Sequence, residues 1–110
     1  MGITKSDEFT QRENRIAKYG KALAHPARVA ILQVLIKKQS CICGDIVEEL
    51  PLSQSTVSQH LKELKESGLI KGEIEGAKVC YCIDEKELEL AKVSINGLFE
   101  AFTKAKNKCC

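Results

Sequence analysis

Apolar residues recur at helical spacing over most of this chain and alternate with polar residues over one short stretch. Helical spacing predicts helices over about residues 8–23, 26–38, 44–50, 53–69 and 85–105. Residues 69–75 and 77–84 instead alternate around Gly76, which predicts a β-hairpin. The pattern therefore predicts a mainly α fold with one small β-hairpin.

The helix over 53–69 has an apolar side and a short polar side. Val57, Leu61 and Leu64 recur at helical spacing and would dock the helix on a core. The polar side chains can reach base edges and phosphates in a major groove. The predicted DNA-contacting residues are Gln54, Ser55, Thr56, Ser58, Gln59, His60 and Lys62. For His60, packing is the alternative to a phosphate contact, and an ordinary amphipathic surface helix would show the same overall pattern.

The segments around this helix favour DNA binding. Ser53 can cap its N-terminus, and Gly68 can end it in the left-handed conformation. The helix over 44–50 ends before Pro51, and two helices joined by so short a turn are typical of a helix-turn-helix. A hairpin directly after a recognition helix is a wing. The sequence thus predicts a winged helix-turn-helix.

The length and charge of the chain indicate which broad class of protein it belongs to. A chain of 110 residues is expected to form one domain over 1–110, with flexible tails at 1–8 and 104–110. The net charge of +2 does not establish nucleic-acid binding, although residues 1–40 hold eight Lys and Arg against three acidic residues. No apolar run approaches the roughly 20 residues of a membrane span, and the polar start is unlike a signal peptide. We therefore expect a cytoplasmic protein without membrane contact.

The last predicted helix repeats apolar residues in a heptad-like stripe. The stripe consists of Leu88, Ala91, Ile95, Leu98, Phe99 and Phe102. A single domain of this size would struggle to cover it from within. The stripe therefore predicts a partner surface, aided by Phe9 and Ile16 of the first helix.

Three stretches are similar to a known family. They are Leu-Ala-His-Pro-Ala-Arg-Val-Ala-Ile-Leu at 23–32, the segment 52–69, and Lys-Val-Cys-Tyr at 78–81. With the order of elements, they resemble the ArsR/SmtB family of metal-responsive bacterial repressors over about residues 13–100. The resemblance implies a homodimer, joined through the first and last helices, on a palindromic double-stranded operator. DNA binding is expected to need no cofactor.

Cys41 and Cys43 stand at the predicted start of the helix over 44–50. Thiolates are soft ligands for thiophilic ions, and a helix N-terminus favours the thiolate form. The pair resembles the Cys-Val-Cys-Asp-Leu element of arsenical-resistance members, which implies that trivalent arsenic or antimony is the inducer. Residues two apart on a helix point about 200° away from each other, so one ion could hold both sulfurs only in a non-helical or unwound segment. The alternative is that both are small buried residues.

According to the same resemblance, trivalent arsenic prefers three sulfurs, and Cys41 and Cys43 supply two. Cys80 and Cys82 share one face of the hairpin. They could form an exposed dithiol, but we expect substituted surface positions, held away from Cys41 and Cys43 by the recognition helix. Cys109 and Cys110 end the chain and could reach the site of either subunit. One of these two, or an external thiol such as glutathione, is the predicted third ligand.

Other functions find little support. The chain has no Walker loop, GxGxxG or GxSxG, so it is not expected to be an enzyme. Residues 85–108 contain no His or Asp, so the ligand set of zinc-sensing relatives is absent from the last helix. Two alternatives remain open. One is a repressor of the same fold that responds to thiol oxidation or reactive sulfur, and the other is a dimeric DNA-binding module without a ligand.

Overall fold

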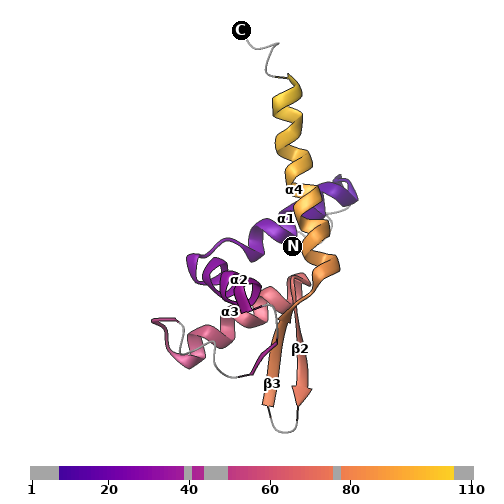
Figure 1. Cartoon of the computed structure of the whole chain (residues 1–110). Helices are drawn as coiled ribbons and strands as arrows, with labels where there is room; N and C mark the ends of the chain where they lie inside the picture. The colour runs from indigo at the N-terminus through magenta and orange to yellow at the C-terminus, as the bar shows by residue number, and fades with distance from the viewer. Residues whose placement is uncertain (1–7, 39–40, 44–49, 76–77, 106–110) are drawn as a thin grey trace.

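The computed structural model describes residues 8–38, 41–43, 50–75 and 78–105. The elements in chain order are α1 (Gln11–Ala22), α2 (Pro26–Lys38), β1 (Ile42–Cys43), α3 (Gln54–Ser67), β2 (Ile70–Glu75), β3 (Lys78–Ile83) and α4 (Glu85–Ala105). The C-terminal part of α4 extends away from the other elements (Figure 1). The mainly α fold with a hairpin is confirmed, as are the bounds of α2 and α4. The helix predicted over 44–50 lies, apart from Leu50, outside the described residues.

β1 is a strand that the sequence did not predict. It pairs antiparallel with β3 and makes a three-stranded sheet of order β1-β3-β2. Ile42 lies opposite Tyr81, and Cys43 lies opposite Cys80. Ile42 is buried in the core, which explains why this segment is extended along the sheet. Cys43 therefore belongs to a strand and not to the first turn of a helix.

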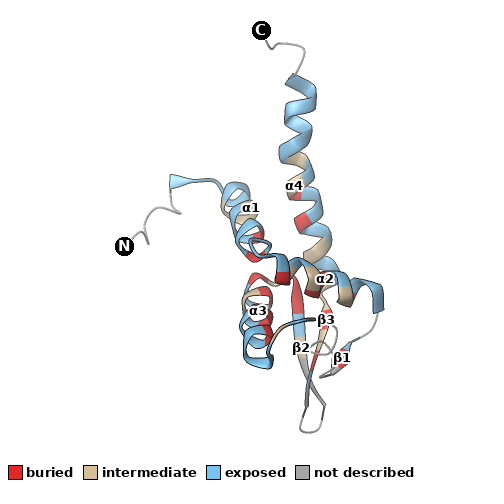
Figure 2. Cartoon of the chain, turned by 90° about the vertical axis from the view of Figure 1, so that its left-hand side faces the viewer, coloured by how far each residue is buried: buried red, intermediate tan, exposed pale blue. Residues whose placement is uncertain are grey.

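The core lies where the first three helices meet the sheet. The inward sides of α1, α2 and α3 are buried, whereas most of α4 is exposed (Figure 2). The largest fully buried side chains include Tyr19, Ile31 and Leu35. On α3, the predicted docking residues Val57, Leu61 and Leu64 are all buried.

Both ends of α3 are capped as predicted. The Ser53 hydroxyl accepts a hydrogen bond from the Thr56 N–H at 3.3 Å. Gly68 ends the helix with φ 89°, a left-handed conformation in which its N–H donates to the Lys65 carbonyl at 3.0 Å. The caps fix the length of the helix because they satisfy backbone groups that would otherwise lack partners.

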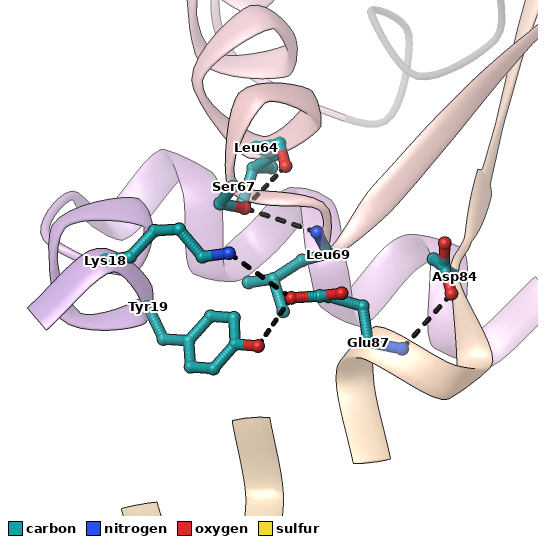
Figure 3. Close-up of polar contacts among 7 residues, drawn as sticks. All are labelled: Lys18, Tyr19, Leu64, Ser67, Leu69, Asp84 and Glu87. Atoms are coloured by element: carbon teal, nitrogen blue, oxygen red, sulfur yellow. Dashed lines mark hydrogen bonds and ion pairs between the residues drawn. The ribbon is translucent and has the colours of Figure 1, made fainter. Parts of the chain in front are cut away.

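Glu87 connects α1 to α4. The Tyr19 hydroxyl donates to Glu87 Oε2 at 2.5 Å, and Lys18 Nζ lies 3.4 Å from the same oxygen (Figure 3). Burial, followed by the hydrogen bond to Glu87, raises the pKa of Tyr19 to about 12. Asp84 Oδ1 accepts from the Glu87 N–H at 3.1 Å and so caps the first turn of α4. These contacts position α4 on α1.

The same carboxylate lies against the end of α3. A Cβ added to Gly68 would lie 3.0 Å from Glu87 Cδ. Close by, Ser67 Oγ donates to the Leu64 carbonyl at 2.6 Å and accepts from the Leu69 N–H at 3.3 Å (Figure 3). The C-terminus of α3 is thus packed against the helix pair α1 and α4.

Replacing Gly68 tests this packing. Gly68→Ala should lower the free energy of unfolding by about 1–3 kcal/mol, because a Cβ is strained at this φ and would press on Glu87. Gly20→Ala is the matched control, since nothing lies within 4 Å of its added Cβ. It should be neutral or stabilising by up to about 1 kcal/mol. Urea denaturation measures both variants, and equal effects would contradict the tight approach at Gly68.

Candidate DNA-binding helix and cysteine cluster

The N-terminal half of α3 presents a polar surface. Val57 and Leu61 face the core, and the residues that point away from them carry hydroxyl, amide and ammonium groups. The exposed residues of this surface are Gln54, Ser55, Thr56, Ser58, Gln59 and Lys62. In the first turn, the Ser53 hydroxyl donates to Thr56 Oγ1 at 2.9 Å and lies 3.3 Å from Ser55 Oγ. Because most of these exposed side chains are short, the surface can come close to a partner.

His60 does not belong to this surface. It is only 9 % exposed, and its Nδ1 accepts a hydrogen bond from Arg28 Nε at 3.1 Å. Its ring centroid lies 4.4 Å from that of His25. Burial, with smaller effects of His25 and Arg28, lowers the pKa of His60 below 6.5. The sequence left a phosphate contact and packing open as roles for His60, and the structure shows that the side chain packs inside the fold.

Two cysteines at β1 lie opposite the two cysteines of β3. Cys41 directly precedes β1 and Cys43 is in it, and we call these two the β1 cysteines. Cys41 and Cys82 form a disulfide, with their Cα atoms 4.3 Å apart. Cys80 is also in the disulfide-bonded form, and its register partner across the strands is Cys43. Four cysteines therefore occupy neighbouring positions on two paired strands.

This arrangement overturns two predictions about the wing cysteines. Cys80 and Cys82 are 1 % and 7 % exposed, so they are not surface positions. They are not held away from Cys41 and Cys43 either, because β1 pairs directly with β3. The repeated Cys-x-Cys spacing at 41–43 and 80–82 matches an antiparallel pairing and could have suggested this contact.

The described residues form no ready-made metal centre. Within the part of the chain that the structure describes, no group of three His, Cys, Asp or Glu is arranged to hold a metal ion. Sulfurs joined in a disulfide are not thiolate ligands, so Cys41 and Cys82 could bind an ion only when reduced. Cys109 and Cys110, the predicted tail ligands, lie outside the described residues.

The apolar stripe of α4 is divided between two environments. Leu88, Ala91 and Ile95 pack against the core of their own chain. Phe99 and Phe102 are 65 % and 68 % exposed, and Leu98 is exposed beside them. Phe9 of the segment before α1 is exposed as well. The half of the stripe nearer the C-terminus is thus an uncovered apolar surface.

The fold and the exposed polar helix are those of a winged helix-turn-helix DNA-binding protein. Residues 25–71 match the family described as bacterial regulatory protein, arsR family. An uncharacterised HTH-type transcriptional regulator of Methanocaldococcus jannaschii is 34% identical over 85 residues, which are 76% of this chain and 94% of that protein. The cadmium resistance transcriptional regulatory protein CadC homolog of Staphylococcus aureus is 35% identical over 86 residues, covering 77% of this chain and 70% of that one.

Solved structures agree with this grouping. A possible transcriptional regulator for arsenical resistance matches with a TM-score of 0.60 and 28% identity, over 74% of this chain and 80% of that one. A homodimeric winged helix-turn-helix DNA-binding domain from Mycobacterium bovis matches with a TM-score of 0.62 and 25% identity, over 91% and 92%. The chain belongs to the ArsR/SmtB family. It is a transcriptional regulator and not an enzyme.

No helix among the described residues is long and apolar enough to cross a membrane.

The buried His60 predicts a dependence of stability on pH. Because the fold favours neutral His60, its contribution is present above pH 6.5 and is lost as the pH falls from there through the lowered pKa. His60→Gln should remove this dependence. His25→Gln should keep most of it, since burial is the main cause of the shift. Thermal unfolding between about pH 5 and 8 measures both, and an unchanged profile in His60→Gln would contradict the assignment.

Proposed function

We propose that the chain is a homodimeric, cytoplasmic repressor that trivalent arsenic or antimony releases from its operator. Family membership supports transcriptional regulation, and the contact between Cys41 and Cys82 carries the proposal for the inducer. It brings together one sulfur from the segment that leads toward α3 and one from the wing strand β3. Soft thiophilic ions prefer such sulfur ligands to carboxylate or imidazole. The similar structure described for arsenical resistance supports the same class of inducer.

The proposed ligands of the inducer include Cys41 and Cys43. The extended conformation found here meets the condition that the two residues not lie on a regular helix, because Cys43 is in β1. The cadmium-related name of one relative makes a soft divalent ion the natural competitor. In the cytoplasm, thiol reductants keep cysteines available as ligands.

Oxidation is the second candidate signal. The disulfide between Cys41 and Cys82 favours it directly, because the bond joins the strand before the helix-turn-helix to the wing. A peroxide would oxidise one thiol to a sulfenic acid, and the second thiol would displace water to form the disulfide. Comparing operator release by arsenite and by peroxide separates the two signals.

The proposed DNA contacts are those of the exposed residues on α3. Gln59→Ala should weaken specific binding by about 1–3 kcal/mol if the amide contacts a base edge. Lys62→Ala should weaken binding to all sequences and reduce the salt dependence, because it removes a phosphate contact. Glu66→Ala, on an exposed position nearer the end of α3, is the control and should bind normally.

Fluorescence anisotropy on an operator selected from a random duplex library measures these effects. Unchanged binding by a variant with Ser55, Ser58 and Gln59 all replaced by Ala would remove α3 as the recognition helix.

The proposed dimer covers the exposed end of α4. Phe99→Lys with Phe102→Lys should give a monomer, because the charges would be buried in the seam between two chains. Glu100→Ala lies on the same turn of the helix and should leave the dimer intact. Sedimentation at micromolar concentration measures the association. A wild-type monomer, or a double variant that stays dimeric, would contradict the seam.

Replacing the β1 cysteines tests the proposed inducer site. In the reduced protein, Cys41→Ser with Cys43→Ser should keep operator binding but abolish its release by arsenite. Cys109→Ser with Cys110→Ser removes the same number of thiols and is the matched control for nonspecific thiol chemistry. Release of the β1 variant by arsenite at the wild-type concentration would place the sensor elsewhere in the chain.

A further inference from the structure

The β1 cysteines face a second pair of cysteines on the wing. Cys41 and Cys82 have Cα atoms 4.3 Å apart. This separation is typical of the close, non-hydrogen-bonded pairs of an antiparallel ladder, whose spacing is about 4.5 Å. Two residues further along the same ladder, Cys43 is paired with Cys80. Because the two kinds of pair alternate, both cysteine pairs occupy close positions of the ladder.

The two wing cysteines can reach a shared ion. Cys80 and Cys82 are two residues apart on β3, so they share one face and their Cα atoms are about 6.7 Å apart. Sulfurs in a pyramidal three-sulfur site, with bonds of about 2.3 Å, are about 3.5 Å apart. If the two sulfurs start as far apart as the Cα atoms, each needs to lean by about 1.6 Å toward the other. The sulfur of Cys41, across the ladder, is already bonded to that of Cys82 and therefore lies beside the same pair.

We propose that Cys80 and Cys82 complete the thiolate site of Cys41 and Cys43, so that one trivalent arsenic or antimony ion is bound by three of these four sulfurs, with at least one from the wing. The inference rests on the proposed function and deepens it, because it names where the third ligand lies. It replaces the terminal cysteines in that role with wing residues of which one is 1 % and the other 7 % exposed. A site built on two paired strands needs no ordering of a chain tail, which would cost about 1–2 kcal/mol per residue.

The chemistry has two balanced steps. A thiol reductant first supplies two electrons and two protons to the disulfide of Cys41 and Cys82, and the same number to the disulfide bond of Cys80; the reductant thiols are oxidised to one disulfide for each bond reduced. Three protein thiols then replace the three hydroxyls of arsenite. Three As–O bonds break and three As–S bonds form, each hydroxyl leaves as water with a thiol proton, and arsenic keeps its oxidation state. The oxidised protein therefore cannot bind arsenite at Cys41, Cys80 or Cys82.

The site would join two functional parts of the fold. β1 lies in the segment that leads toward α3, and β3 is a strand of the wing. An ion held by both strands restrains their separation and relative orientation by its own bond lengths and angles. Binding therefore acts on the wing and on the approach to the recognition helix together.

The test counts sulfurs around arsenic in a full-length protein that lacks the tail thiols. The variant carries Cys109→Ser and Cys110→Ser, is reduced with a phosphine so that no external thiol is present, and receives arsenite. β1 then offers two thiols at most, so a third As–S bond requires β3. X-ray absorption should show three sulfurs per arsenic. Intact mass should show one added arsenic with three hydrogens lost. Two sulfurs per arsenic in this variant would overturn the proposal.

A second arm removes the wing thiols from the same protein. Cys80→Ser with Cys82→Ser should leave two protein sulfurs on arsenic and weaken arsenite binding by about tenfold or more, because the third ligand is no longer held in place. Operator binding without arsenite shows whether the variant with Cys80→Ser and Cys82→Ser is folded. If that variant does not fold, the number of sulfurs on arsenic in the tail variant decides the proposal. Unreduced protein is the negative control.

The outcomes also separate this inference from the proposed function. Three sulfurs on arsenic without release of operator would leave the site in place and reject arsenite as the inducer. Release of operator with only two sulfurs in the tail variant would keep the proposed function and reject the wing ligands.

Discussion

The pairing of β1 with β3 is the contact on which the arrangement of the cysteines depends. Ile42 is buried in the core, and the segment around it is therefore held along the wing strand. The register of that pairing places Cys41 opposite Cys82 and Cys43 opposite Cys80. A shift by one residue would turn the cysteines of β1 to the other face of the sheet. The chemistry of the sulfurs is thus a consequence of a short strand held by one apolar side chain.

A second junction relates the recognition helix to the helices proposed for dimerisation. Glu87 lies in the capped first turn of α4. Its carboxylate accepts a hydrogen bond from the Tyr19 hydroxyl on α1, and its side chain lies against Gly68 at the end of α3. A movement of α4 relative to α1 would therefore press on the end of α3. α3 is capped at both ends and buried along one side. The proposed operator-binding surface is thus connected to the sheet at one side and to the helices of the proposed dimer at the other.

The helices and the hairpin could be predicted from the sequence because each has a clear local signal. Val57, Leu61 and Leu64 mark the buried side of α3, and Ser53 and Gly68 mark its ends. β1 has only two residues, which are too few to show an alternation of apolar and polar positions. It forms by pairing with β3, which is distant in the sequence. The pairing of Cys41 with Cys82 and the packing of His60 on His25 and Arg28 are likewise tertiary contacts. The repeated Cys-x-Cys spacing is the one sequence signal for the first contact, and the second has no local signal.

Ligand binding at the cysteines and operator binding on α3 are proposed to be coupled, and the coupling can be measured in both directions. Operator affinity is measured for the reduced wild-type protein with and without saturating arsenite, and arsenite affinity with and without operator. Arsenite is expected to weaken operator binding by about 5–150-fold, and operator to weaken arsenite binding by the same factor. Operator affinity that does not change when the protein is saturated with arsenite would contradict this coupling.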